Sequence, residues 1–517
     1  MLSPACAPRA DGPRHSTVPR PSPVAQLQHD LETLFTTGQA ARVLWGVRVL
    51  AASPPGQLPH VLYDRNPAQL LMPASNMKIL TLAAAAERLG WDYRFDTIVR
   101  ATAPIDEHGT IRGDIVVVGS GDPTISRRFD GSATLASWAQ LLWELGVRRV
   151  EGRVLGDASR FPSATIGAGW EWDDLAYGYA ARISALSYNE NTAELLVAPG
   201  PSLGAAASVT AIDIAPGIDV RSTLKTSNAT ARRLQLAWAP DDGVITIRGE
   251  VPLGYTPFKA YVAVPDPPQY FAQAVRAALI ARGIVVNGGA ASAETDPPGP
   301  DAPEAPVLFR HHSPTLREIA VPLMKVSQNL YAELLLRTLG VVERSDASQG
   351  PAVLTDVLDH WGAGPDAAIV ADGSGLSRHN LTSAHTVALV LTRMLDPRHR
   401  EAWLAALPVA GVDGTLERRM RGTPAEGRVY AKTGSIGYVR SLSGYARTAE
   451  DKWMTFSIIA NNFAGSVAAA DVDRITEAAV NRLVIFATEP QSTQSSSATE
   501  PRSAQSLSAT EAQSAQR

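Results

Sequence analysis

The sequence contains little cysteine, few long apolar runs and no excess of basic charge. Cys6 is the single cysteine among 517 residues, which excludes an internal disulfide. No apolar stretch approaches the ~20 residues that span a bilayer, so no transmembrane segment is expected. A net charge of −4 does not favour a nucleic-acid partner. None of the ten histidines has ligand spacing such as His-Glu-x-x-His, so no metal is predicted.

The bulk composition predicts a globular protein of two or three domains. Hydrophobic residues make up 45% and charged residues 19% of the chain, which is typical of a soluble fold. Residues 1–26 are rich in Pro, Arg and Ser and contain no apolar stretch of signal-peptide type, so we expect a disordered segment there. The Ser/Gln-rich residues 488–517 are also predicted to be disordered.

The sequence between these two ends predicts a discontinuous domain that is interrupted by a large insert. Residues 27–97 and 306–487 form the discontinuous domain, and 98–305, with short β-rich segments broken by Gly and Pro, form the insert, expected as two smaller β-rich domains. The individual elements expected in the discontinuous domain are helices over 24–35, 79–90, 316–339 and 385–394, strands over 42–51 and 60–63 with a turn at 54–56, a strand-rich region over 427–462 and a last helix to about residue 486.

Lysine is also scarce, with six lysines among 47 basic residues. A buried lysine can lose its proton, which arginine cannot do in a protein. Ser75 and Lys78 lie three residues apart at the start of a helix that is apolar almost all round, so their side chains share one face near the positive end of the helix dipole. Ser222 and Lys225 have the same spacing but lie in the β-rich insert, and we interpret that copy as chance.

Two further motifs make the first copy specific. Ser327-Gln328-Asn329 precedes an apolar helix and places a hydroxyl and an amide on a helix-start loop. Lys432-Thr433-Gly434-Ser435 stands inside a strand-like run, where a lysine, a hydroxyl and a glycine suit a substrate carboxylate and a close approach of backbone. Ser-x-x-Lys, Ser-x-Asn and Lys-Thr-Gly in this order are the motif set of serine β-lactamases and penicillin-binding proteins.

The chain resembles the class C low-molecular-mass penicillin-binding proteins, the D-Ala-D-Ala carboxypeptidase/endopeptidase family (peptidase family S13), from about residue 27 to 486. It departs from the family at Gln328, where Asp or Asn is more usual, and in the missing signal peptide. Beyond the three motifs, the likeness includes residues 119–124, the segment from Trp170 to Asn191, the glycine-rich stretch 372–378 and residues 410–416.

The resemblance implies an α/β (α+β) fold: a transpeptidase-like or β-lactamase-like catalytic domain, with an antiparallel sheet flanked by helices and interrupted by insert domains. It implies that Ser75 attacks the carbonyl between two D-alanines, with Lys78 as general base. Ser327 would relay the proton to the leaving amine, and Asn329 would bind substrate or lysine. The terminal carboxylate would lie on Lys432 and Thr433, and the amides of Ser75 and Ser435 would form the oxyanion hole.

The family likeness also implies peptidoglycan stem peptides as substrates, β-lactams as covalent inhibitors, no cofactor, and a periplasmic or other extracytoplasmic location. An acidic residue of the insert would meet the free amine of the stem peptide. Asp157 is the candidate, with Arg378 binding a carboxylate on the same substrate side chain; alternatively, Asp157 caps a turn before Ser159. Two other functions remain open: a β-lactamase or esterase of the same fold, and a non-catalytic cell-wall-binding protein.

Overall fold

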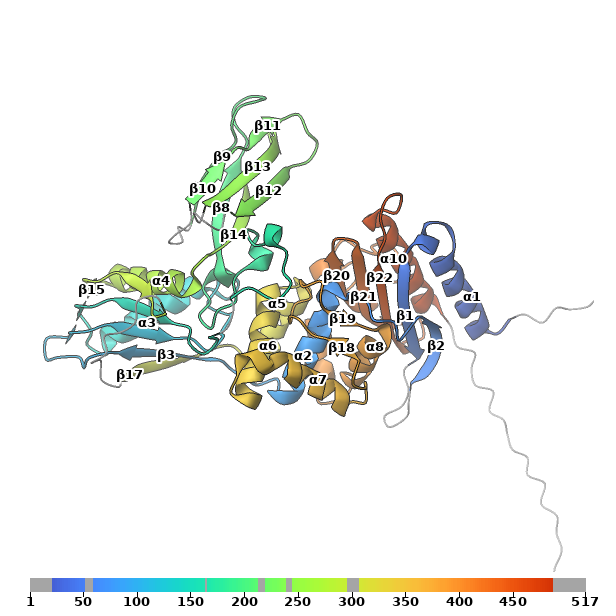
Figure 1. The fold of residues 1–517 in the computed structure, drawn as a ribbon, viewed down its shortest axis with the longest axis horizontal. Helices are drawn as coiled ribbons and strands as arrows, with labels where there is room; N and C mark the ends of the chain where they lie inside the picture. Colours follow the sequence, from blue (N-terminus) through green and yellow to red (C-terminus); the bar gives the residue numbers. More distant parts are fainter. Residues whose placement is uncertain are drawn as a thin grey trace, which may run out of the picture.

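The computed structural model describes residues 21–51, 59–162, 165–212, 219–238, 244–294 and 306–486 (Figure 1). The predicted tail over 488–517 and the turn expected at 54–56 lie outside these residues, as does most of the N-terminal segment that we expected to be disordered. Helix α1 (Pro23–Thr36) begins inside that segment, because the Ser22 side chain accepts a hydrogen bond from the Ala25 amide and proline occupies the first turn.

Five antiparallel strands form the sheet of the main domain, in the order β2-β1-β22-β21-β20. The N-terminal strands pair with the C-terminal strands through β1 and β22, so the two parts of the discontinuous domain share one sheet. The expected antiparallel sheet is confirmed, with β20 at its edge. The strands are β1 (Leu44–Ala51), β2 (His60–Arg65), β20 (Val429–Ile436), β21 (Val439–Arg447) and β22 (Trp453–Asn461).

Helices cover both faces of this sheet (Figure 1). α1 and α10 (Ala469–Ile485) pack on one face, where alternate residues of β22 such as Phe456 and Ile458 point. Ile459 points to the opposite face, into a second core. The helices on that face are α2 (Met77–Arg88), α5 (Leu316–Lys325), α6 (Asn329–Arg344), α7 (Gly350–His360), α8 (Ala384–Arg393) and α9 (Arg400–Ala406).

Helix α2 lies at the centre of the main domain, as its apolar sequence predicted. All residues of Met77–Ala86 are buried, among helices α5, α6, α7 and α8. The turn that leads into it, Ala74–Asn76, packs against β20 and β21. No helix within the described ranges is long and apolar enough to cross a membrane.

The first lobe of the insert combines strands with two helices. A mixed five-stranded sheet has the order β16-β7-β5-β3-β17, and a small parallel sheet has the order β15-β6-β4. Helices α3 (Gly131–Glu144) and α4 (Pro267–Arg282) pack together over this lobe. The strands are β3 (Asp96–Ala101), β4 (Thr110–Ile111), β5 (Ile115–Val118), β6 (Arg149–Val150), β7 (Val154–Asp157), β15 (Val285–Val286), β16 (Ala290–Ser292) and β17 (Val307–His312).

The sequence analysis expected short β-rich segments here and missed both helices. The signals for α4 were present: Asp266 caps its N-terminus by accepting from the Gln269 amide, and Gly283 ends it with a φ of 100°. β3 begins just before the insert predicted over 98–305 and β17 lies just after it, and the two strands pair with each other in antiparallel register.

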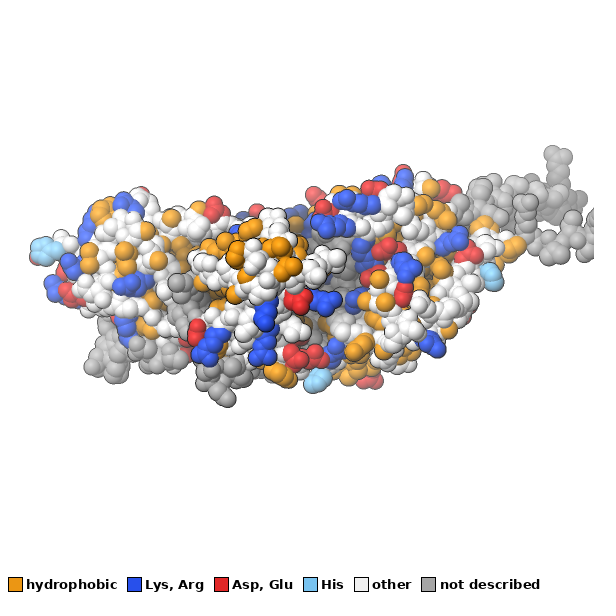
Figure 2. All heavy atoms as spheres, turned by 90° about the horizontal axis from the view of Figure 1, so that it is seen from above, with side chains coloured by type: hydrophobic (Ala, Val, Ile, Leu, Met, Phe, Trp, Pro, Cys, Tyr) orange, Lys and Arg blue, Asp and Glu red, His pale blue; other side chains and the backbone are white. Residues whose placement is uncertain are grey.

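The second lobe consists of two small sheets with their own core and stands out from the molecule as an arm (Figure 1). Seen from above, hydrophobic side chains gather over this arm (Figure 2). Leu203 and Leu253 are among its exposed apolar residues. The strands are β8 (Thr192–Ala198), β9 (Ser208–Ala211) and β14 (Phe258–Ala263) in one sheet, and β10 (Asp219–Ser222), β11 (Lys225–Ser227), β12 (Arg233–Trp238) and β13 (Val244–Pro252) in the other.

Candidate active site

Ser75 and Lys78 meet at the N-terminal end of α2. Ser75 lies in a single 3₁₀ turn (Ala74–Asn76) that leads directly into the helix, and Lys78 lies in the first helical turn. The Lys78 Nζ donates a hydrogen bond to the Ser75 Oγ at 3.0 Å. The predicted sharing of one helix face is therefore observed, with a nucleophile and a candidate base in direct contact.

The surroundings of Lys78 favour its neutral form. Its side chain is completely buried, and its Nζ also donates to the Asn329 Oδ1 at 2.6 Å and to the Ser374 carbonyl at 2.7 Å. Burial lowers the pKa of Lys78 to about 7, while the carboxylates of Asp372 and Glu333 act in the opposite direction. At neutral pH a large fraction of the lysine is therefore able to accept the proton of the serine hydroxyl.

A second buried lysine approaches from strand β20. The Nζ of Lys432 donates to the Ser327 Oγ at 2.8 Å and to the Thr433 carbonyl at 2.7 Å. Burial and the nearby charge of Lys78 hold the pKa of Lys432 well below its usual range. A carboxylate bound beside Lys432 would favour its charged form, because an opposite charge at a few ångströms raises a lysine pKa.

Ser327 stands in the break between α5 and α6, where the predicted helix over 316–339 is interrupted. Its backbone has a φ of 63°, which turns its hydroxyl toward β20. Gln328 caps the following helix: its side-chain oxygen accepts from the Leu330 amide at 3.1 Å. Asn329 then projects its amide between Lys78 and the Tyr179 carbonyl, to which its Nδ2 donates at 2.8 Å.

Gly434 brings the edge strand close to the nucleophile. A Cβ atom at this position would lie 2.1 Å from the Ser441 Oγ and 3.0 Å from the Ser75 backbone nitrogen. Only glycine permits this approach. Ser435, the next residue along the edge, is exposed, and the Thr433 Oγ1 donates to the Thr415 Oγ1 at 2.8 Å.

Two buried carboxylates, Asp372 of a loop and Glu333 of helix α6, hold that loop against the site. The loop lies between β18 (Ala368–Ile369) and β19 (Leu381–Thr382). Asp372 accepts hydrogen bonds from the Trp170 indole at 2.9 Å and from the Ser377 amide at 2.6 Å. Glu333 accepts from the Ser374 amide at 2.8 Å. These bonds fix the Ser374 carbonyl on Lys78.

Glu333 was not identified from the sequence, although a lone carboxylate inside an apolar helix was a usable signal. Burial and the neighbouring Asp372 raise the pKa of Glu333 to about 7. Its side chain lies under the loop and contacts no bulk solvent. Glu333 therefore acts on the charge of Lys78 through space, since the hydrogen bonds of Lys78 go to Ser75, Asn329 and Ser374.

Arg378 lies near the far end of β20. Its Nη1 donates to the Gly437 carbonyl at 3.0 Å, in the turn that follows Ser435, and its Nε donates to the Glu171 Oε1 at 2.6 Å. Glu171 is followed by a short acidic turn (Trp172–Asp174), which the sequence analysis also passed over. The guanidinium predicted to bind a substrate carboxylate is thus placed beside the site and pairs with a carboxylate of the chain.

Asp157 lies in the first lobe of the insert. It ends β7, and its Oδ1 accepts a hydrogen bond from the Ser159 amide at 2.9 Å, as the turn-capping alternative anticipated. Among the described residues no hydrogen bond or ion pair joins it to the groups around Ser75. The second Ser-x-x-Lys copy has a different local structure from the first: Ser222 ends one strand and the exposed Lys225 begins another.

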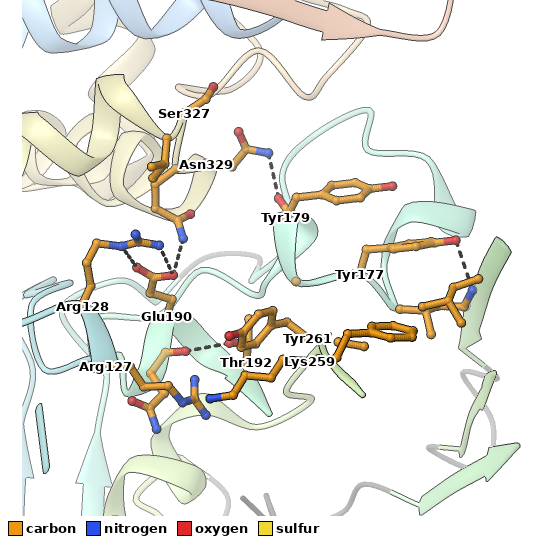
Figure 3. A pocket seen from close by; sticks show the side chains of 18 of the residues that line it. Arg127, Arg128, Tyr177, Tyr179, Glu190, Thr192, Lys259, Tyr261, Ser327 and Asn329 are labelled. Carbon is orange, nitrogen blue, oxygen red and sulfur yellow. Dashed lines mark hydrogen bonds and ion pairs between the residues drawn. The ribbon is translucent and has the colours of Figure 1, made fainter. Parts of the chain in front are cut away.

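A cavity of about 670 Å³ opens beside Ser327 and Asn329, between the main domain and the insert (Figure 3). Its wall on the insert side contains the ring of Tyr179 and the carboxylate of Glu190. Glu190 joins the two sides, because its Oε2 accepts from the Gln328 Nε2 at 2.7 Å. Within the described ranges, no group of three His, Cys, Asp or Glu side chains has an arrangement that could hold a metal ion.

Comparisons with known proteins agree with this geometry. A family model described as the D-Ala-D-Ala carboxypeptidase 3 (S13) family matches residues 27–482. A D-alanyl-D-alanine carboxypeptidase of Actinomadura sp. (strain R39) is 33% identical over 473 residues, covering 87% of this chain and 84% of the relative. The carboxypeptidase DacB of Haemophilus influenzae is 27% identical over 413 residues, covering 78% of this chain and 83% of the relative.

Among solved structures, that of penicillin binding protein 4 (dacB) from Haemophilus influenzae is similar over nearly its whole length. The TM-score is 0.74 at 25% identity, covering 88% of this chain and 99% of that chain. The likeness therefore includes the inserted lobes as well as the main domain.

Proposed function

This chain belongs to the D-Ala-D-Ala carboxypeptidase 3 (S13) family of serine hydrolases, and we propose that it cleaves the D-alanyl-D-alanine ends of peptidoglycan stem peptides through an acyl-enzyme on Ser75. One observation carries the proposed role of Ser75: the Lys78 Nζ lies 3.0 Å from the Ser75 Oγ, and the pKa of Lys78 is lowered to about 7. A serine with a neutral amine at this distance has the base that it needs to become a nucleophile.

In the first step, Lys78 takes the hydroxyl proton while the Ser75 Oγ attacks the carbonyl carbon between the two D-alanines. The developing oxyanion lies between the backbone amides of Ser75 and Ser435. The short separation between Gly434 and the Ser75 amide supports this pairing, since it brings the strand edge beside the helix start.

In the second step the C–N bond breaks and the departing amine receives, through Ser327, the proton that Lys78 took from Ser75. Lys432 and Thr433 hold the carboxylate of the departing D-alanine. The bond from Lys432 to the Ser327 Oγ supports this assignment, because it joins the carboxylate-binding lysine to the proton relay. A water molecule then attacks the ester carbonyl. Lys78 takes one proton from the water and returns it to the Ser75 Oγ as the ester C–O bond breaks, so no cofactor is required.

Recognition of the stem peptide is proposed at Arg378 and Asp157. Arg378 is placed to bind a substrate carboxylate in exchange for Glu171. Asp157 would meet the free amine, at an expected cost of about 10- to 150-fold for the alanine variant on an amine-bearing peptide. Equal losses on that peptide and on a simple penicillin would assign Asp157 to the turn at Ser159 instead.

We propose that the chain acts in the periplasm or another compartment outside the cytoplasmic membrane. Peptidoglycan lies there, and the relatives named above are carboxypeptidases and penicillin-binding proteins. β-Lactams are expected to acylate Ser75, because their strained amide and carboxylate imitate the D-Ala-D-Ala terminus.

The test is to incubate the purified chain with a fluorescent penicillin and, separately, with a pentapeptide that ends in D-Ala-D-Ala. The unaltered chain should be labelled covalently and should release D-alanine. Ser75→Ala should do neither, while Ser222→Ala should do both. Labelling of Ser75→Ala would remove Ser75 from the mechanism, and rapid turnover of the penicillin without release of D-alanine would indicate a β-lactamase.

A further inference from the structure

A lysine that the proposed reaction does not use connects the Ser327 segment to a neighbouring loop. Lys325 ends α5, two residues before Ser327. Its Nζ donates to the Asp413 Oδ2 at 2.5 Å and to the Leu407 carbonyl at 3.0 Å. The side chain of Lys325 is only 20% exposed, so this ion pair is partly shielded from water and salt. Residues 407–416 are therefore tied to the end of the helix from which Ser327 follows.

This loop covers the beginning of the outer edge of β20 and leaves the end of that edge open. Val409 pairs with Tyr430 in antiparallel orientation. The Ala431 amide donates to the Pro408 carbonyl at 3.0 Å. From Thr433 onward, no strand in the described part of the chain pairs with this edge. A peptide that adds to the open edge would therefore meet the loop at Thr433.

The open part of the edge coincides with the path of the substrate in the proposed reaction. Alternate residues of a strand direct their amides to the same side, so the Ser435 amide points outward as the Ala431 amide does. In the proposed reaction the Ser435 amide meets the oxyanion, and Thr433 meets the carboxylate of the departing D-alanine. The substrate thus runs along the open edge toward the loop, and its carboxylate ends beside the loop.

Thr415 presents a hydroxyl at this end of the loop. It lies in a single 3₁₀ turn, it is exposed, and its Oγ1 lies 2.8 Å from the Thr433 Oγ1. The preceding Gly414 packs so closely on α5 that a Cβ there would lie 2.5 Å from the Lys325 carbonyl oxygen, and its φ of 58° also favours glycine. Together with the ion pair between Lys325 and Asp413, this packing fixes the position of Thr415 beside Thr433.

We propose that Thr415 is a positioning residue that directs the Thr433 hydroxyl onto the substrate carboxylate, and so contributes to the selection of substrates with a free carboxylate. The inference rests on the proposed function, in which Lys432 and Thr433 hold that carboxylate. A hydroxyl has one proton and rotates to suit its neighbours. In the structure Thr433 donates to Thr415. A bound carboxylate is the stronger acceptor and takes the Thr433 proton, and Thr415 then rotates to donate to the Thr433 Oγ1.

The test compares a penicillin, which carries a carboxylate, with its methyl ester, in which that group is neutral. Mass spectrometry of the intact chain gives the rate constant of acylation by each compound, and the ratio of the two rate constants measures recognition of the carboxylate. Thr415→Val should lower this ratio about fivefold, which is the usual contribution of one hydrogen bond between neutral groups. Thr415→Ser keeps the hydroxyl and should restore the ratio. Thr210→Val, at an exposed position on β9 of the second lobe, is the matched control and should keep the ratio of the unaltered chain.

A double-mutant cycle separates positioning from direct contact. In the background of Thr433→Val, Thr415→Val should lower the ratio no further, because Thr415 acts through Thr433. Additive losses would overturn the inference, since they would mean that each hydroxyl acts on the carboxylate independently. An unchanged ratio in Thr415→Val, equal losses on the penicillin and its ester, or the same fall in Thr210→Val would also overturn it and leave the proposed function standing. An unaltered chain that the penicillin does not acylate overturns the proposed function itself.

Discussion

The chain contains the Ser-x-x-Lys pattern twice, and the two copies occupy opposite environments. Ser75 and Lys78 lie on the first turn of a helix whose beginning is enclosed by protein, and their side chains touch. Ser222 and Lys225 lie on two short strands that pair with β13, and Lys225 is exposed. The Oγ of Ser222 accepts from the nearby Leu224 amide at 3.3 Å. The spacing brings a serine and a lysine into contact at Ser75 because a helix aligns residues three apart, and burial there lowers the pKa of the lysine.

The largest effect should come from replacing Lys78, with the replacement of Lys225 as the control. Lys78→Met should slow acylation by penicillin by roughly 10²- to 10⁴-fold, the usual contribution of a general base. Lys225→Met should acylate at the rate of the unaltered chain. The measurement is the time course of covalent labelling by mass spectrometry, with circular dichroism to show that both variants are folded. Rapid acylation of Lys78→Met would mean that another group takes the serine proton.

A smaller effect should come from moving β20, the strand that lies beside Ser75. Gly434→Ala should push β20 away from Ser75, with a loss of about 1–3 kcal/mol in the free energy of unfolding and slower acylation. Gly289→Ala is the control, since a Cβ there meets no atom within 4 Å. Denaturant unfolding and labelling rates measure the two consequences. A Gly434→Ala variant that is as stable and as fast as Gly289→Ala would contradict the close approach of the edge strand.

The smallest effect concerns the pH at which Lys78 becomes neutral. The rate of acylation should rise with pH through about 7, because the lysine acts as a base only after losing its proton. The Glu333 carboxylate raises the pKa of Lys78, so Glu333→Gln should move the midpoint of the pH–rate profile to lower pH. Glu343→Gln, an exposed position on the same helix, should leave the midpoint in place. A shift to higher pH in Glu333→Gln would contradict the assigned electrostatics.

Much of the main domain and the central part of the site could be predicted from short segments of sequence. Helix α2 carries its own signal, because its residues are apolar on every side, and each of the three motifs lies within four residues. The contact of Lys432 with Ser327 required the relative position of a strand edge and a helix break more than a hundred residues apart. Local pattern contains no information of that kind.

The insert was harder to predict for the same physical reason. β3 pairs with β17 across the whole length of the insert, and the residues of one strand do not predict that the other is its partner. Helix α4 is different, since the cap at Asp266 and the stop at Gly283 were visible and were outweighed by the surrounding glycines and prolines. Asp157 was chosen from its place in the sequence, whereas Glu171 is the carboxylate that the fold brings to Arg378.

The pairing of β3 with β17 has a consequence for how the two halves of the main domain find each other. Thr97 pairs with His311, and the contact continues beyond the strands, where the Ser313 amide donates to the Phe95 carbonyl at 2.9 Å. Once the inserted lobes are folded, the polypeptide that leaves the main domain and the polypeptide that returns to it are already adjacent. A loop of about two hundred residues then behaves as a loop of about ten, which lowers the entropic cost of joining the halves by roughly 2–3 kcal/mol. The folded lobes thus hold the two segments that connect them to the main domain next to each other, which favours the packing of α2 beside the Ser327 loop.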